Sequence, residues 1–417
     1  MTAHSSHCLM GLFKCTRILL LCLLVFGNTG QSFAYEYAVT VPITGSNNLA
    51  NAAEFDKKII NIMQQGQIPG GTVAIIKNNQ FVVQRGYGHA DIEANVIMQP
   101  NQIMRVGSVS KAITTVAIFQ LVQQGKLRLD DKVFAILSDL KVSPSHAAAL
   151  KQITVRNLLQ MSAGWFHDRP QDYDPLTGPW SNQMLQALDH QIPPDCVTVA
   201  KLMAQTPLDF KPGTLYTYSN VNYCLLGLIF NKITNTSGSN GYENTIQQKL
   251  LAPLAIQSMH IGYTQETKKF PKEVKYYFFG PEEMSHYIDR KLDGLPYSDT
   301  DLLHKNFADG GWVASAIDLA KLFHAVAIGT ILNEQTLQLL MVPYTFSNTP
   351  GKVHGLGFDE IKTVDGHRYF FKTGSFSGTQ ALIVMSDNGN AYAALFNAKP
   401  KDHKRFVGEL KKLFVSA

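Results

Sequence analysis

Ser108-Val-Ser-Lys111 sets a hydroxyl beside an amine, because it stands at the start of a predicted helix where positions i and i+3 share one face. A serine attacks a carbonyl group only after a neighbour has taken or withdrawn its proton, and Lys111 is placed to act on Ser108. Backbone N–H groups at a helix N-terminus also favour developing negative charge. The pattern alone is weak. Ser138-Asp-Leu-Lys141 matches it in a polar loop, and a serine before an apolar helix is commonly a plain N-cap.

A second motif whose side chains could take part in catalysis, Tyr218-Ser-Asn220, precedes an apolar run at 221–230. A phenol acts as a base near neutral pH only where nearby cations lower its pKa. The amide of Asn220 is suited to binding a substrate. The same residues are also typical of a turn in which Asn220 caps the following helix, so this motif leaves both interpretations open.

The third motif, Lys372-Thr373-Gly374, occurs once, at the end of a predicted strand, and Ser375 follows it. A strand edge can align an extended substrate by backbone pairing. Lys372 then places positive charge beside a substrate carboxylate, and Gly374 permits close approach. The alternative is a strand that ends in a turn. The three motifs together, widely separated and in this order, indicate one active site.

The elements that must position these motifs are strands at both ends of the chain with helices between them. Helical spacing of apolar residues, caps and glycine stops predict the helices, and short apolar runs bounded by turn residues predict the strands. We expect helices near 50–63, 108–124, 154–161, 221–234, 242–251, 315–328 and the C-terminus, and strands at 72–77, 81–85, 356–361, 368–372, 380–385 and 391–396. This order predicts an α+β fold with one antiparallel sheet built from both chain ends, flanking helices and an inserted helical region, rather than a doubly wound fold.

Composition limits the class of protein. Hydrophobic residues make up 45% of the 417 residues and charged residues 17%, which suits a large core and excludes a disordered chain. The net charge is +5 without a long Lys/Arg run, so nucleic acid is not an expected partner. The usual zinc-ligand spacings are absent from the sequence, and we expect neither metal nor cofactor. The oligomeric state is left open.

Residues 1–34 have the order of a secretory signal peptide. Lys14 and Arg17 precede the apolar run 18–26, and Ser32-Phe-Ala34 is a small-x-small cleavage site. The run is shorter than the ~20 residues that span a bilayer, so we expect cleavage after Ala34 and a secreted or periplasmic protein of residues 35–417. Cys196 and Cys224 remain in that part of the chain. They form either a disulfide or two separate buried thiols.

The set Ser-x-x-Lys, Tyr-x-Asn and Lys-Thr-Gly resembles the serine β-lactamase and penicillin-binding protein superfamily. The tyrosine of the second motif is similar to the class C β-lactamase and D-alanyl-D-alanine carboxypeptidase branch, since class A enzymes carry Ser-Asp-Asn there. The likeness extends over roughly residues 50–400. It includes the segments 104–111, 124–131, 153–159, 212–220, 310–315 and 372–375.

The resemblance implies a β-lactamase/transpeptidase-like catalytic domain at 35–417. Its α/β part would lie at about 50–107 and 308–417, and its mainly helical part at about 108–307, with an irregular insertion near 262–307. The implied activity is serine hydrolysis through an acyl-enzyme on an amide or ester carbonyl, with a β-lactam or D-Ala peptide as substrate.

The resemblance also implies a role for each motif residue. Ser108 is the nucleophile, Lys111 holds and polarises it, and Tyr218 carries the proton to the leaving group and later activates water. Asn220 binds the substrate amide, and Lys372 and Thr373 bind the substrate carboxylate. Gly374 lets the substrate approach the strand closely. The backbone N–H groups of Ser108 and Ser375 form the oxyanion hole.

Two departures from the family pattern bear on the substrate. Phe376 follows the third motif where relatives have a Gly-rich turn, and it is expected to narrow the pocket. The insertion near 262–307, which contains the aromatic run 276–279, is either a lid or partner surface or a cover for an exposed core edge. The cover is favoured because aromatic residues usually bury. An α/β-hydrolase is excluded because no Gly-x-Ser-x-Gly occurs. An esterase on the same fold and a catalytically silent binding or assembly relative remain as alternatives.

Overall fold

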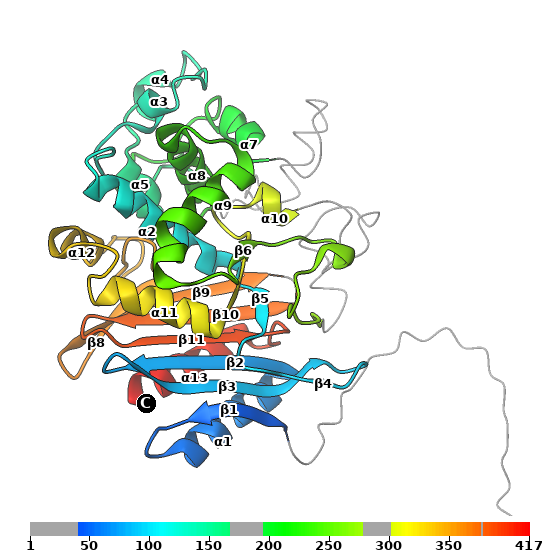
Figure 1. The fold of residues 1–417 in the computed structure, drawn as a ribbon. Coiled ribbons are helices and arrows are strands. Elements are labelled where there is room, and N and C mark those ends of the chain that lie inside the picture. The colour runs from blue at the N-terminus through cyan, green and yellow to red at the C-terminus, as the bar shows by residue number, and fades with distance from the viewer. Residues whose placement is uncertain (1–40, 167–194, 278–301, 377) are drawn as a thin grey trace, which may run out of the picture. The chain divides into compact units, whose positions relative to one another are not determined.

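A computed structural model of the protein describes residues 41–166, 195–277, 302–376 and 378–417 (Figure 1). These all belong to one compact unit, residues 35–417. The predicted signal peptide, the proline-rich stretch at 170–194 and part of the aromatic run lie outside the described residues. Within them, no helix combines the length and apolar character that crossing a membrane requires.

The main sheet is antiparallel and joins the two ends of the chain. Its strand order is β1-β3-β2-β11-β10-β9-β8, and the N-terminal and C-terminal strands meet where β2 pairs with β11. The predicted α+β fold is therefore confirmed. The strands are β1 (Ile43–Asn47), β2 (Gly70–Lys77), β3 (Gln80–Asp91), β8 (Glu360–Val364), β9 (His367–Phe376), β10 (Thr379–Ser386) and β11 (Ala391–Phe396), with β4 (Val96–Ile97) added to β3.

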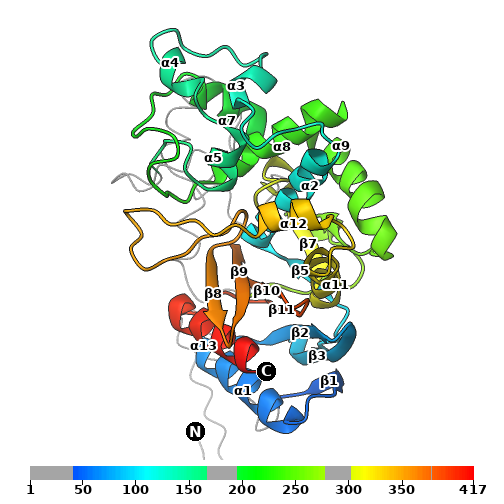
Figure 2. The same cartoon turned by 90° about the vertical axis from the view of Figure 1, so that its left-hand side faces the viewer.

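Helices cover both faces of this sheet (Figures 1 and 2). Alternate residues of a strand point to opposite faces. In β2, Val73 and Ile75 pack in the apolar cluster that includes α1 (Ala52–Gly66) and α13 (His403–Ser416). Ala74 and Ile76 pack in the cluster on the other side, which includes α11 (Ala316–Ala327). Burial on both faces explains why β2 is apolar throughout.

The helical part is built around α2 (Ser110–Gln123), which is buried on almost every side, as expected of a helix that is apolar all round. Among the described residues, the other helices of this part are α3 (Val133–Ile136), α4 (Ala147–Leu150), α5 (Val155–Leu159), α7 (Cys196–Met203), α8 (Asn220–Thr234), α9 (Gly238–Ile246) with the short helices η2 (Gln247–Leu251) and η3 (Ala252–Leu254), η4 (Glu266–Lys268) and α10 (Leu302–Lys305). The helix α12 (Glu334–Leu340) follows α11 in the C-terminal part of the chain.

A small sheet that the sequence did not predict lies immediately before the turn that carries Ser108. It consists of β5 (Ile103–Arg105), β7 (Trp312–Ser315) and β6 (His260–Ile261), in the order β5-β7-β6. These strands are too short to leave a clear alternating pattern. β5 runs directly into the turn that carries Ser108, so its pairing with β7 fixes where that turn begins.

Local signals in the sequence were accurate at several element ends. Thr154 caps α5 in a capping box with Asn157, and the Ser315 side chain caps α11 by accepting from the Asp318 N–H. The predicted strand at 356–361 is wrong at its start, because β8 begins at Glu360. Gly357 interrupts that run with a φ of +79°, a backbone conformation outside the strand region.

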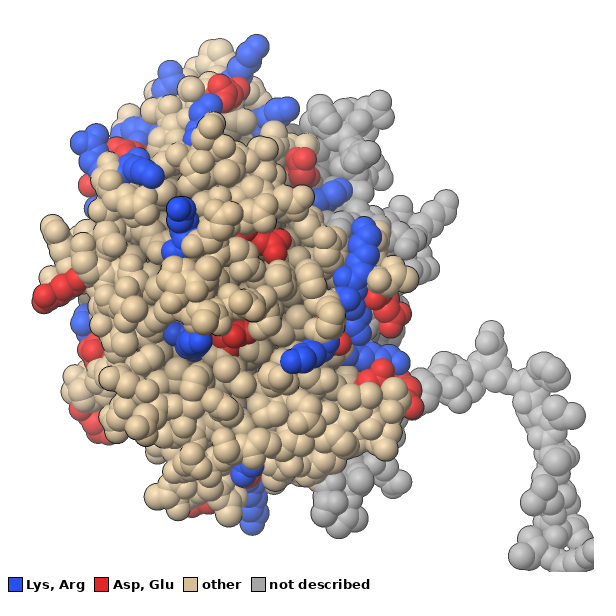
Figure 3. All heavy atoms as spheres, viewed as in Figure 1, with Lys and Arg blue, Asp and Glu red and all other residues tan. Residues whose placement is uncertain are grey.

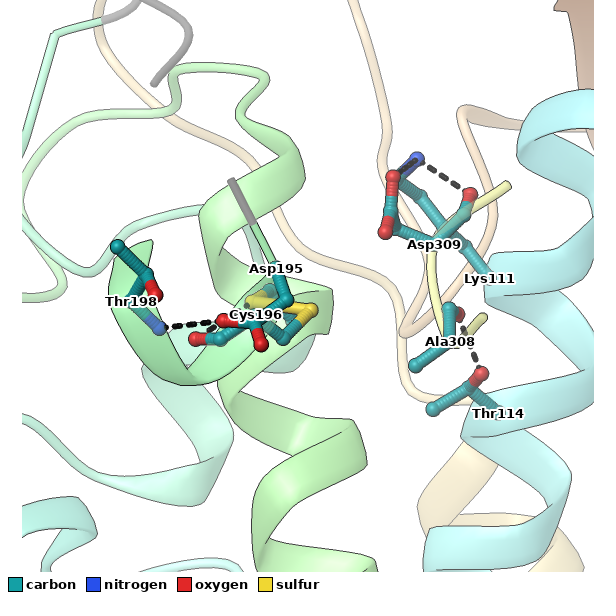
Figure 4. The surroundings of a disulfide bond; sticks show 8 residues. Lys111, Thr114, Asp195, Cys196, Thr198, Ala308 and Asp309 are labelled. Atoms are coloured by element: carbon teal, nitrogen blue, oxygen red, sulfur yellow. Dashed lines mark hydrogen bonds and ion pairs between the residues drawn. A yellow bond between two sulfur atoms is a disulfide. The ribbon is translucent and has the colours of Figure 1, made fainter. Parts of the chain in front are cut away.

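Cys196 and Cys224 form a disulfide between α7 and α8, with their Cα atoms 5.3 Å apart (Figure 4). Of the two alternatives left open by the sequence, the structure has the disulfide. On the face of the molecule seen in Figure 3, basic and acidic side chains are interspersed.

Candidate active site

Ser108 lies in a 3-10 turn, η1 (Gly107–Val109), between β5 and α2. It is half-buried, whereas Gly107 and Val109 are buried on either side of it. Ser110 anchors the turn, because its buried hydroxyl accepts a hydrogen bond of 3.1 Å from the backbone N–H of Trp312 in β7. Ser108 does not act as an N-cap, since the start of α2 has no side-chain cap.

Lys111 points its ammonium group at Ser108 from the first turn of α2. Only 1% of the residue is exposed. Its Nζ donates to Ser108 Oγ at 3.1 Å, Asn220 Oδ1 at 2.6 Å and the carbonyl oxygen of Asp309 at 2.8 Å. An ammonium group has three N–H donors, and these three acceptors match them. The carboxylate of Asp309 lies 4.0 Å from the same Nζ and supplies negative charge beside it (Figure 4).

The segment that carries Asp309 is held between α2 and α8. The Thr114 hydroxyl, one turn beyond Lys111, donates to the carbonyl of Ala308 at 2.5 Å (Figure 4). On the other side, a Cβ at Gly227 of α8 would lie 2.6 Å from the Ala308 Cβ, so only glycine permits this approach. Asp309 was missed in the sequence, where its only signal is its position before the Gly310-Gly311 pair.

Tyr218 comes from the segment before α8 and donates its hydroxyl to Ser108 Oγ at 2.6 Å. Its ring lies close to two cations, with Lys111 Nζ 5.2 Å and Lys372 Nζ 5.1 Å from the ring centroid. Burial nevertheless raises the pKa of Tyr218 to about 12, although the Lys372 ammonium acts in the opposite direction. The nearby Lys372 ammonium therefore does not offset the effect of burial on the pKa of this phenol. The resting phenol is a proton donor.

The third motif contacts the turn that carries Ser108 directly through its backbone. A Cβ at Gly374 would lie 1.9 Å from the carbonyl oxygen of Val106 and 3.1 Å from the backbone nitrogen of Ser108. From the other side, a Cβ at Gly107, whose φ is +51°, would lie 2.7 Å from the carbonyl oxygen of Ser375. Both glycines are required for β9 to lie against η1, which brings the backbones of Ser108 and Ser375 together.

Lys372 and Thr373 contact a residue that the sequence analysis did not single out. Lys372 Nζ donates to Asp359 Oδ1 at 2.5 Å, while the backbone N–H and hydroxyl of Thr373 donate to Asp359 Oδ2 at 2.8 and 2.7 Å. Burial raises the pKa of the Asp359 carboxyl, but the Lys372 ammonium and the Thr373 hydrogen bonds outweigh it and lower the pKa below its usual value. The signal in the sequence was the acidic pair Asp359-Glu360 inside the predicted strand 356–361.

The structure thus brings all the predicted site residues to one place, where β9, η1, α2 and the start of α8 meet. Phe376 is buried, with its ring centroid 5.9 Å from the Arg105 guanidinium. Tyr276 is also buried and hydrogen-bonded to Glu273, which agrees with the favoured interpretation of that part of the aromatic run. Among the described residues, no group of three or more His, Cys, Asp or Glu side chains could hold a metal ion.

A family model described as Beta-lactamase matches residues 55–414. The chain therefore belongs to the Beta-lactamase family, a family of serine hydrolases, and its Tyr-x-Asn motif fits the class C branch. "Protein flp" of Staphylococcus aureus (strain NCTC 8325 / PS 47) is 31% identical over 216 residues, which are 52% of this chain and 39% of that protein. The match thus spans about two fifths of the length of that relative.

Two solved structures share the fold. The octameric penicillin-binding protein homologue from Pyrococcus abyssi has a TM-score of 0.66 at 23% identity, covering 88% of this chain and 78% of its own. The D-amino acid amidase from Ochrobactrum anthropi SV3, complexed with D-phenylalanine, has a TM-score of 0.65 at 17% identity, covering 87% and 99%.

Proposed function

We propose that this protein is a serine hydrolase that forms an acyl-enzyme at Ser108 on an amide or ester carbonyl. The observation that carries the proposal is the pair of hydrogen bonds received by Ser108 Oγ, from Tyr218 at 2.6 Å and from Lys111 at 3.1 Å. Two donors on one oxygen, one of them cationic, favour the negative charge that develops as the hydroxyl loses its proton. A serine with a purely structural role has no use for this arrangement.

The proton path follows from the protonated state of Tyr218. As Ser108 Oγ bonds to the substrate carbonyl carbon, Tyr218 takes the hydroxyl proton and passes its own phenolic proton to the leaving nitrogen or oxygen. The bond to the leaving group then breaks and leaves the acyl-enzyme. In deacylation, water attacks the ester carbon, and its proton returns through Tyr218 to Ser108 Oγ. The phenol is neutral before and after each step, as its raised pKa requires.

Lys111 acts in this scheme through its charge. The ammonium stays hydrogen-bonded to Asn220 and Asp309, so it holds Ser108 in place and stabilises negative charge on Oγ. The oxyanion is assigned to the backbone N–H groups of Ser108 and Ser375, which the contact between η1 and β9 brings together. Removing one such donor typically costs about 2.7–4 kcal/mol of barrier.

We also propose that residues 1–34 are cleaved after Ala34 and that the protein acts outside the cytoplasm. The Cys196–Cys224 disulfide supports this, since disulfides persist mainly in oxidising compartments. N-terminal sequencing of the protein from the producing cell tests it. An N-terminus at Tyr35 is expected, and an intact N-terminus on protein exported from the cell would contradict cleavage.

The nucleophile is tested with an organofluorophosphonate, which labels activated serines whatever the leaving group of the natural substrate. We expect one adduct by intact mass in the wild type and none in Ser108→Ala, with a thermal midpoint that is nearly unchanged. Ser138→Ala is the matched control, because Ser138 belongs to the other Ser-x-x-Lys pattern and is exposed. Labelling or ester hydrolysis retained in Ser108→Ala would refute the mechanism.

A further inference from the structure

The Asp359 carboxylate accepts hydrogen bonds from the groups of the third motif that could bind an anion. It accepts from the Lys372 ammonium and from both polar groups of Thr373, at 2.5 to 2.8 Å. These are the groups expected to bind a substrate carboxylate. Both oxygens of Asp359 are engaged, and the Lys372 side chain is only 3% exposed against 22% for Asp359. The anion subsite is therefore filled by the chain itself.

Asp359 is held firmly in this position from both sides of its loop. Its backbone N–H donates to the carbonyl of Phe371 in β9 at 2.8 Å, and its carbonyl accepts from Nδ1 of the buried His354 at 3.1 Å. Two residues earlier, Gly357 packs against Thr115 of α2 so closely that a Cβ has no space there. The loop is thus fastened to the strand that carries Lys372 and to the helix that carries Lys111.

We propose that Asp359 determines specificity by excluding leaving groups with a free carboxylate and admitting neutral or positively charged ones. This inference rests on the proposed hydrolase function and narrows its substrate class. The β-lactam and D-Ala peptide substrates implied by the resemblance carry a carboxylate, and they are expected to be poor substrates. Amides and esters with an uncharged or amine-bearing leaving group are the class that fits.

The charges around the subsite give the direction of this preference. Lys372 and Asp359 neutralise each other, so an incoming carboxylate finds no net positive charge and lies beside a like charge. It also finds Thr373 already engaged, and displacing Asp359 would break all three hydrogen bonds. A carboxamide meets no repulsion. An ammonium group is attracted to the part of Asp359 that lines the pocket next to Tyr216 and Tyr218.

Three thioesters with one acyl group and different leaving thiols test the inference. The leaving groups are mercaptoacetate, mercaptoacetamide and 2-(trimethylammonio)ethanethiol, which are anionic, neutral and cationic at pH 7, and the quaternary nitrogen of the third cannot take the acyl group from sulfur. Released thiol reports kcat/KM. For the wild type we expect the neutral and cationic esters to exceed the anionic one by at least tenfold. This measurement needs no variant and stands even if substitutions at Asp359 impair folding.

Asp359→Asn then separates specificity from structural support. We expect the ratio of kcat/KM for the anionic ester to that for the neutral ester to rise at least tenfold, because a structural defect alone would lower both together. Asp365→Asn is the matched control. It removes the same charge from an exposed position in the β8–β9 turn, and its ratio should equal that of the wild type.

Three results would overturn the inference: a wild type that prefers the anionic ester, a ratio unchanged in Asp359→Asn, or a wild type that hydrolyses none of the esters although the fluorophosphonate labels it. In each case normal labelling of Ser108 leaves the hydrolase function intact. Failure of labelling itself, or hydrolysis that persists in Ser108→Ala, would remove the proposed function instead.

Discussion

Replacing Gly374 with alanine should separate the two backbones that meet at Ser108. The added Cβ would lie 1.9 Å from the Val106 carbonyl oxygen, and real Cβ atoms are essentially never closer than 3.0 Å to such a neighbour. β9 and η1 must therefore move apart by about 1 Å, a misplacement that typically costs on the order of 100-fold in rate. This corresponds to about 2.7 kcal/mol of activation barrier.

The assay is kcat/KM on a neutral ester, together with the rate of fluorophosphonate labelling and thermal unfolding. Both rates should fall about 100-fold in Gly374→Ala, while overpacking costs only about 1–3 kcal/mol of stability, so the protein remains folded. Gly408→Ala in α13 is the control, because its Cβ would meet nothing within 4 Å and alanine favours a helix. Activity of Gly374→Ala within threefold of the wild type would refute the claim that this backbone contact positions the site.

Two further predictions concern the protonation of Tyr218 and the disulfide. Removal of the proton carrier in Tyr218→Phe should lower kcat by about 10²–10⁴. Because burial raises the pKa of Tyr218 to about 12, this variant should lose no tyrosinate absorbance below about pH 10. A tyrosinate signal at pH 8 that disappears in the variant would contradict the proton path. Reduction of Cys196–Cys224, which are 28 residues apart, should lower the free energy of unfolding in urea by about 2–4 kcal/mol. The double variant Cys196→Ser/Cys224→Ser should not respond to reductant, and a wild-type midpoint that reductant does not move would contradict the role given to this bond.

The sequence was most informative where a structural rule is local. Thr154 and Ser315 indicate where helices begin, because the side-chain oxygen of a cap residue accepts a hydrogen bond from a backbone N–H only two or three residues away. Between the predicted strands 72–77 and 81–85, Asn78 and Asn79 both adopt positive φ, which asparagine tolerates better than most residues. The three motifs were recognised for a related reason, because the chemistry needs particular side chains in a particular order.

What the sequence left undecided depends on groups far apart in the chain or on burial. The Asp309 carbonyl that holds Lys111 is 198 residues away from it, and a backbone carbonyl has no signature in the sequence. The protonated state of Tyr218 could not be predicted either, because its pKa follows from a balance between burial, the Lys372 ammonium and the nearby carboxylates, which only the packed structure sets.

By itself, then, the sequence of this protein determined the kind of fold and the set of side chains that form the proposed hydrolase site, because both follow from residue types and short-range periodicity. The tertiary structure alone decided that the Asp359 carboxylate binds the Lys372 ammonium and the Thr373 donors, because charge complementarity acts between atoms within a few ångströms in space. Whether the anion subsite is open or filled is therefore a property of the packed structure, and it carries the inference about substrate class.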